Sequence, residues 1–169
     1  MSDEETYFNI NGLEELAKQL SSKNCTAKLG ILGSKNARKP EPGEKNIPTN
    51  AEIGAAHEFG GKLPARSFLR MPISQYLNKQ IEKPGFFNQK DIDTAIRKKS
   101  LRNMVEKIAV AGLAIVLEAF DTGGFGTWAQ LSEARIKQRA KLNQGTQILV
   151  VPSSHQLRDS QSFEIEETI

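Results

Sequence analysis

The sequence has few of the residues that usually mark a chemical site. Its 169 residues include one cysteine, Cys25, and two histidines, which excludes an internal disulfide and a zinc site of the common Cys/His kind. No run approaches the roughly 20 apolar residues that a membrane span needs. The start, Met1 to Thr6, is acidic where a signal peptide would be basic and then apolar. We therefore expect a protein made in a reducing cytoplasm, with no metal and no membrane contact.

An excess of either charge is also missing. The 23 basic and 20 acidic residues leave a formal charge of +3, which is too small a bias to indicate a nucleic-acid-binding protein. Basic residues gather at 97–102 and 135–141 without interleaved aromatic residues. These stretches are read as solvated helix faces, or else as surfaces that contact DNA nonspecifically, or an acidic protein, through charge alone. The length and the 38% hydrophobic content predict one domain over 1–169.

The periodicity of apolar residues predicts an α+β fold. We expect a small antiparallel or mixed sheet packed by a long central helix and several short helices. From Ile108 to Phe120 the long helix is apolar nearly all round, so it should be covered by a sheet and other helices, or by other subunits. The predicted helices cover 11–20, 49–59, 72–81, 91–120 and 131–142, and the predicted strands cover 26–32, 147–151 and 160–166.

The helix predicted at 49–59 has clear signals at both ends. Thr49 and Glu52 have the spacing of a capping box, and Gly60 supplies a residue that can end the helix in a left-handed conformation. The spacing of Ile53, Ala56 and Phe59 would place these three side chains on one face. Before this helix, residues 34–48 are charged and rich in proline, with almost nothing to bury. This segment is predicted to be an exposed loop that is functional, mobile or simply solvated.

Three motifs resemble catalytic or ligand-binding signatures but lack essential parts. His57-Glu58 begins like a zinc-protease motif, yet Gly61 stands where the second histidine is needed. Asp121-Thr122-Gly123 matches half of an aspartic-protease site, but it occurs once and follows a helix; a homodimer could supply a second copy, and a helix stop is the plainer interpretation. The glycines at 123–126 lack the lysine and the preceding strand of a phosphate-binding loop. We predict no catalytic residue, no cofactor and no enzymatic activity.

Three blocks read in order are similar to the tail-completion, or virion-morphogenesis, family of tailed bacteriophages. The first runs from Ala51 to Gly61 and ends in His-Glu-Phe-Gly-Gly. The second runs from Leu63 to Arg70 and resembles a Pro-Ala-Arg-Pro-Phe-Leu segment, with Ser67 where proline is usual. The third begins at Trp128 and continues through a helix and a turn into the strand at 160–166. In that turn, 153–155 read Ser-Ser-His in place of the family's Thr-Gly.

The resemblance implies a structural virion protein that completes the tail and joins it to the head in the neck region. It implies a ring of copies, hexameric in this family, that contacts neck, connector and tail proteins in the virion after assembly in the host cytoplasm. A tail terminator that caps the tail tube is the closest alternative, and a basic DNA-contacting packaging accessory protein is a weaker one. The candidate assembly-interface residues are His57, Glu58, Phe59, Gly60, Arg66, Phe68, Leu69 and Trp128. For Phe59, Phe68 and Leu69 the alternative is that they fill the core of the subunit.

Overall fold

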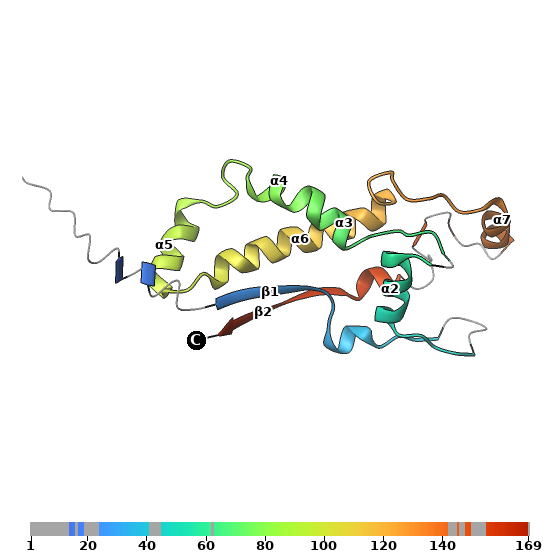
Figure 1. Cartoon of the computed structure of the whole chain (residues 1–169), viewed down its shortest axis with the longest axis horizontal. Helices are drawn as coiled ribbons and strands as arrows, with labels where there is room; N and C mark the ends of the chain where they lie inside the picture. Colours follow the sequence, from blue (N-terminus) through green and yellow to red (C-terminus); the bar gives the residue numbers. More distant parts are fainter. Residues whose placement is uncertain are drawn as a thin grey trace, which may run out of the picture.

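A long helix, α6 (Arg102–Thr122), forms the axis of the fold. The computed structural model describes residues 14–15, 17–18, 24–40, 45–61, 63–141, 145, 148–149 and 155–168. Within them, α6 lies between a two-stranded antiparallel sheet and a layer of shorter helices (Figure 1). The predicted α+β class, with a small sheet packed by a long central helix, is confirmed. The other elements are β1 (Asn24–Ile31), η1 (Gly33–Asn36), α2 (Asn50–Phe59), α3 (Arg70–Pro72), η2 (Ile73–Leu77), α4 (Asn78–Ile81), α5 (Gln89–Lys98), α7 (Glu133–Lys141), α8 (Gln156–Asp159) and β2 (Gln161–Thr168).

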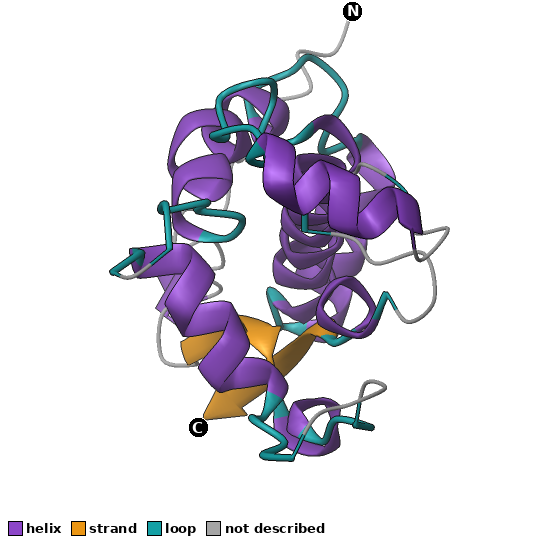
Figure 2. Ribbon diagram, turned by 90° about the vertical axis from the view of Figure 1, so that its right-hand side faces the viewer, coloured by secondary structure: helices purple, strands orange, loops and turns teal. Residues whose placement is uncertain are grey.

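The sheet pairs two segments that are far apart in the sequence. β1 and β2 are antiparallel, and their register runs from Asn24 opposite Thr168 to Ile31 opposite Gln161. Side chains alternate along both strands: Leu29 lies on the side of α6, whereas Lys28 and the glutamates of β2 are exposed. Figure 2 shows most of the helices gathered on one side of the two strands. The strands predicted at 26–32 and 160–166 are therefore confirmed.

The helical layer across α6 contains one irregular turn. α3, η2 and α4 follow one another without a break, and η2 is a π-helical turn. Its side chains reach α6 at Gly112, where an added Cβ would lie 3.4 Å from Ile73 Cδ1 and 3.1 Å from Leu29 Cδ2 of β1. Glycine at this position lets both layers close on the central helix. The predicted helix at 72–81 is confirmed, with a wider turn than expected.

The single helix predicted over 91–120 is wrong. Two helices, α5 and α6, cover this stretch, because Lys99 adopts a left-handed conformation (φ 50°) that ends α5. Asn88, rather than Asp91, is the N-cap of α5, and the two form a reciprocal capping box. The break turns α5 back beside the start of α6, where Lys107 Nζ lies 2.7 Å from the Asp91 carboxylate. Tertiary packing has overridden an uninterrupted helical pattern.

α2 begins at the predicted capping box, but a different face is buried. Thr49 and Glu52 form both hydrogen bonds of the box. The buried residues are Asn50, Gly54 and Glu58, whereas Ala56 and Phe59 are exposed. The predicted stripe is therefore wrong for Ala56 and Phe59, although Ile53 is partly buried and packs against the core. The reason is close packing at Gly54, where an added Cβ would lie 2.9 Å from Ile31 Cδ1 and 3.3 Å from Phe68 Cζ.

The loop predicted at 34–48 is exposed over most of its described residues but is partly ordered by neighbouring segments. It begins within η1, and Asn50 Nδ2 donates to the carbonyl oxygens of Lys35 and Ala37 at 2.9 and 3.1 Å. Lys39 exchanges two hydrogen bonds with the Gln156 side chain, at 2.7 and 3.0 Å. The segment up to residue 40 is therefore attached to both α2 and α8.

Three further predictions concern the ends of the chain. The helix at 131–142 is confirmed as α7. The strand at 147–151 is wrong for Ile148 and Leu149, which form a bend and pack against the core; the rest of that segment lies outside the described residues. Of the helix at 11–20, residues 14, 15, 17 and 18 are described, and they are helical and exposed; the remainder lies outside the described residues.

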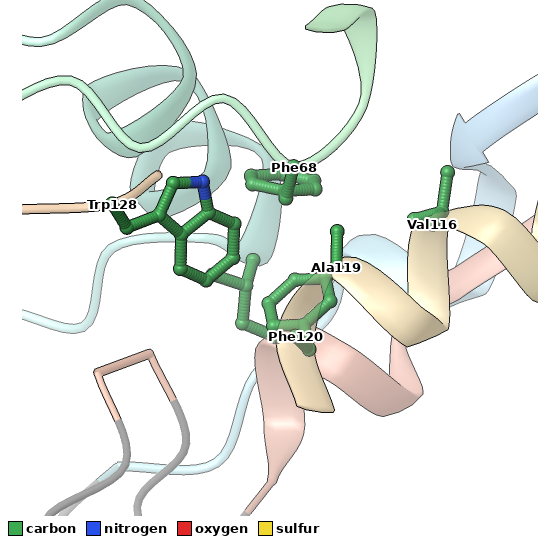
Figure 3. Packing of buried hydrophobic residues seen from close by; sticks show 6 residues of the cluster. Phe68, Val116, Ala119, Phe120 and Trp128 are labelled. Atoms are coloured by element: carbon green, nitrogen blue, oxygen red, sulfur yellow. The ribbon is translucent and has the colours of Figure 1, made fainter. Parts of the chain in front are cut away.

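The best-buried apolar cluster lies at the carboxyl end of α6 (Figure 3). Val116, Ala119 and Phe120 are each at most 2% exposed, which confirms that most of the apolar half of the predicted long helix is covered, although Val110 is 52% exposed. The Phe120 ring packs against Phe68, with centroids 5.0 Å apart, and meets Trp128 edge-on at 6.0 Å. Phe68, the end of α6 with the nearby Trp128, and Leu157 of α8 therefore share one core.

Candidate assembly interface

Glu58 is the centre of a polar joint at the end of α2. Its carboxylate is 5% exposed as a residue and accepts four hydrogen bonds. Ser67 Oγ donates at 2.6 Å, and the backbone N–H groups of Phe68, Leu69 and Arg70 donate at 2.9, 3.0 and 3.0 Å. These amides stand at the start of α3, where a helix has N–H groups without partners of its own. Glu58 thus caps one helix from the end of another, and its negative charge suits that position.

Ser67, which stands where the resembling segment usually has proline, makes two side-chain hydrogen bonds. Its hydroxyl donates to Glu58 and also accepts from the backbone N–H of Met71 at 2.9 Å. Proline, the residue usual at this position in the resembling segment, has neither a hydroxyl nor a backbone N–H. The serine therefore adds two hydrogen bonds to the joint.

Arg66 and Trp128 connect this joint to the third block of the sequence. Arg66 is 6% exposed and donates from Nε and Nη2 to the carbonyl oxygen of Ala129, at 3.2 and 3.1 Å. Trp128 is 4% exposed, and its indole N–H donates to the carbonyl oxygen of Ser67 at 3.1 Å. Burial lowers the pKa of the Arg66 guanidinium. Both side chains hold the two segments together from inside the subunit.

A glycine makes room for the tryptophan. Gly124 has a positive φ of 68°, and an added Cβ would lie 2.1 Å from Trp128 Nε1. Only glycine adopts this conformation readily and leaves that space free. The glycine-rich turn after α6 therefore has a packing role. It lets the indole ring of Trp128 cover Phe120.

The eight predicted interface residues divide into three groups by exposure. Glu58, Arg66, Phe68 and Trp128 are buried within the subunit, and His57, Gly60 and Leu69 are partly buried. Phe59 is 69% exposed. The buried residues offer no surface to a partner in this fold, so they act on any interface only by shaping the subunit.

Phe59 and Leu63 form an exposed apolar surface beside the joint, which we call the exposed step. The Phe59 ring stands 5.4 Å from the Arg70 guanidinium carbon, and Leu63 beyond the glycine turn is 48% exposed. Sequence reasoning missed Leu63, although it lies in the second block. An exposed aromatic ring beside an arginine is the composition found at the centre of protein interfaces.

The residues of the other candidate motifs have structural contacts instead. The Asp121 carboxylate is bound by Arg158 through two hydrogen bonds of 3.1 and 3.0 Å. Burial and the nearby Glu167 raise the pKa of the Cys25 thiol, against the effect of Arg102, which keeps the thiol in its less reactive form. His57 is partly buried; burial and then the charge of Arg66 lower its pKa.

The described residues show neither a metal site nor a membrane-spanning helix. Within the described ranges, no group of three His, Cys, Asp or Glu side chains is placed to hold a metal ion. None of the helices in that part of the chain combines the length and the apolar character that a membrane crossing requires. Comparison of the sequence and structure with protein-family models, curated proteins and solved structures gives no match.

Proposed function

We propose that the chain is a structural virion protein of a tailed bacteriophage, which completes the tail and joins it to the head as one subunit of a ring. The observation that carries the proposal is the convergence of the three resembling blocks. Glu58 of the first block binds the backbone of the second. Arg66 and Ser67 of the second bind Ala129 and Trp128 of the third.

This convergence supports the resemblance because it gives the matching residues a common physical purpose. Buried polar groups need partners with good geometry, and here the three blocks supply partners to one another across as many as 63 positions of sequence, as in the bond from Trp128 Nε1 to the backbone carbonyl of Ser67. Such a meeting is what the resemblance predicts if the three blocks form one structural unit.

The exposed step of Phe59 and Leu63 is the surface that we assign to contact with neighbouring subunits or neck proteins. Both side chains are apolar and solvent-exposed, and both flank the two-glycine turn at the end of α2. The ring would consist of copies of this chain, six by the resemblance, and would contact connector and tail proteins in the virion.

Electron microscopy of a lysate in which this gene alone is disrupted tests the proposed function. DNA-filled heads beside separate tails of finished length are expected for a joining protein. Overlong tails would assign the chain to the tail terminators instead. Normal infectious particles would overturn the proposal.

A substitution at the exposed step tests the surface. Phe59→Asp should leave the subunit folded, because the side chain is 69% exposed, and should block incorporation into particles. Val110→Asp, which adds the same charge at a 52% exposed apolar site on α6, is the matched control. Arg66→Glu is unsuitable for this purpose, because it would place an unpaired charge in a buried site. Normal particles from Phe59→Asp would remove Phe59 from the interface.

A further inference from the structure

α7 is attached to the subunit with little buried surface of its own. Every residue of its nine is exposed except Arg139. Isolated helices of this length are marginal in water, and a helix that is polar on all sides needs a partner to stabilise it. The capping contact from Ser132 Oγ to the Arg135 N–H, at 3.3 Å, is local. Something outside the chain's own core is therefore expected to cover α7.

α7 and β2 carry opposite charges. α7 has four basic residues and one acidic residue, for a net charge of +3, and β2 has three glutamates and no basic residue, for −3. Lys137 and Lys141 are exposed and have no hydrogen bond or ion pair in the described part of the chain. Glu164 and Glu166 share the exposed face of the sheet with Lys28, which lies opposite Glu164 and pairs with Glu166, whereas Glu167 lies on the other face and accepts a hydrogen bond from Ser100 Oγ. α7 thus presents unpaired basic charge, and the exposed face of the sheet keeps a net charge of −1 from these three side chains.

The two charged surfaces cannot meet within one subunit. α7 lies at one end of the long axis of the molecule, and the tip of β2 lies toward the other (Figure 1). The spacing of the charges also matches, since residues four apart on a helix rise by about 6 Å and residues two apart on a strand by about 7 Å. Lys137 and Lys141 have the first separation, and Glu164 and Glu166 have the second.

We propose that α7 docks on the exposed, acidic face of β2 in a second copy of this chain. The contact joins two different surfaces, so successive copies associate head to tail and close into a ring when the rotation between them allows it. This inference rests on the ring of the proposed function and assigns the surfaces that build it. Because the attraction is between exposed charges, salt screens it over about 10 Å at 0.1 M.

Sedimentation velocity of the purified full-length chain tests the proposal. At low salt, the chain should form species heavier than the monomer, and high salt should dissociate them. Lys137→Glu with Lys141→Glu should weaken association at least about tenfold, as should Glu164→Lys with Glu166→Lys. Lys79→Glu with Lys83→Glu makes the same charge change on and after α4, and this control should associate as the wild type does.

Mixing the two reversed variants gives the decisive measurement. Each alone places like charges at the contact, but the mixture restores opposite charges at every junction, so alternating assemblies should reappear. A wild-type chain that stays monomeric at low salt, or a mixture that fails to associate, would overturn the docking. Retention on DNA without self-association would assign the basic helix to DNA and would likewise overturn it. None of these results alters the outcome expected from disruption of the gene, so the two proposals fail separately.

Discussion

The two ends of α6 are held in different ways. At the carboxyl end, one buried carboxylate, Glu58, accepts four hydrogen bonds beside a core of packed aromatic rings. At the amino end, α5 and the sheet are held by exposed or partly exposed pairs such as Lys107 with Asp91 and Lys28 with Glu166.

This difference between the two ends of α6 indicates where single substitutions should be least tolerated. A buried acceptor shared by several donors has no substitute, because its removal leaves each donor unsatisfied at once. Exposed pairs are separate from one another and weakened by solvent, so each contributes little. The joint around Glu58 should therefore depend on single residues, and the opposite end on many interchangeable ones.

The largest effect is expected from Glu58→Ala. It removes the acceptor of four donors in and near the core, so the free energy of unfolding should fall by about 3 kcal/mol or more. Urea unfolding followed by the fluorescence of Trp128, the only tryptophan, measures the loss. Glu118→Ala, at an exposed position of α6, is the control. A loss no greater than that of Glu118→Ala would break the proposed contrast.

A second effect should separate packing from backbone strain at two glycines. Gly124 and Gly85 both have positive φ, but only Gly124 faces another side chain, with nothing within 4 Å of an added Cβ at Gly85. Gly85→Ala should cost about 1 kcal/mol from strain, and Gly124→Ala about 3 kcal/mol because the indole must also move. Equal losses in urea unfolding would mean that the turn, rather than the Trp128 contact, requires glycine at 124.

A smaller effect should appear with pH. Burial lowers the pKa of His57 below its ordinary value of 6.5, with a further contribution from the charge of Arg66. The unfolded chain then binds more protons as the pH falls below about 6.5, so this contribution to stability is complete above that pH and is lost as the pH falls through the folded pKa. Urea unfolding at a series of pH values should show a shallower acid slope for His57→Gln than for the wild type. An acid slope in His57→Gln as steep as that of the wild type would contradict the assignment of this effect to His57.

The smallest effect is expected at the sheet. Lys28→Ala removes an ion pair whose two side chains are each 52% exposed, so the unfolding midpoint in urea should stay within experimental error of the wild type. A shift as large as that of Gly85→Ala would show that the amino end of α6 is also held by a specific contact.

Local signals predicted much of the fold, because they depend on neighbouring residues. The capping box at Thr49 and the alternation in β1 and β2 act over a few positions, and both are observed. The break between α5 and α6 has a weaker signal, Ser100, whose hydroxyl accepts from the backbone N–H of Arg102 at 3.1 Å at the start of α6. Nothing in the sequence marks Lys99 for the left-handed conformation that ends α5.

The site was harder to predict because its polar residues are satisfied across long distances. Ile53, Ala56 and Phe59 suggested an apolar face, whereas Asn50 and Glu58, with Gly54 between them, form the buried one. Their regular spacing of four is a signal that could have been used. Nothing local in the sequence indicates that the backbone N–H groups after Ser67 donate to Glu58. The same holds for the carbonyl of Ala129, which accepts from Arg66.

The π-helical turn at Ile73–Leu77 has a consequence for the ancestry of the chain. Such a turn holds one residue more than a regular helical turn, which is what a single-codon insertion into an α-helix would leave behind. Deleting Gln75, which is exposed within it, should restore a regular α-helical turn. Ile73 and Leu77 would then stand three positions apart rather than four, which still places them on one face of the helix, so both should keep their contact with Gly112. The wide turn therefore absorbs an added residue without changing which side chains reach the central helix.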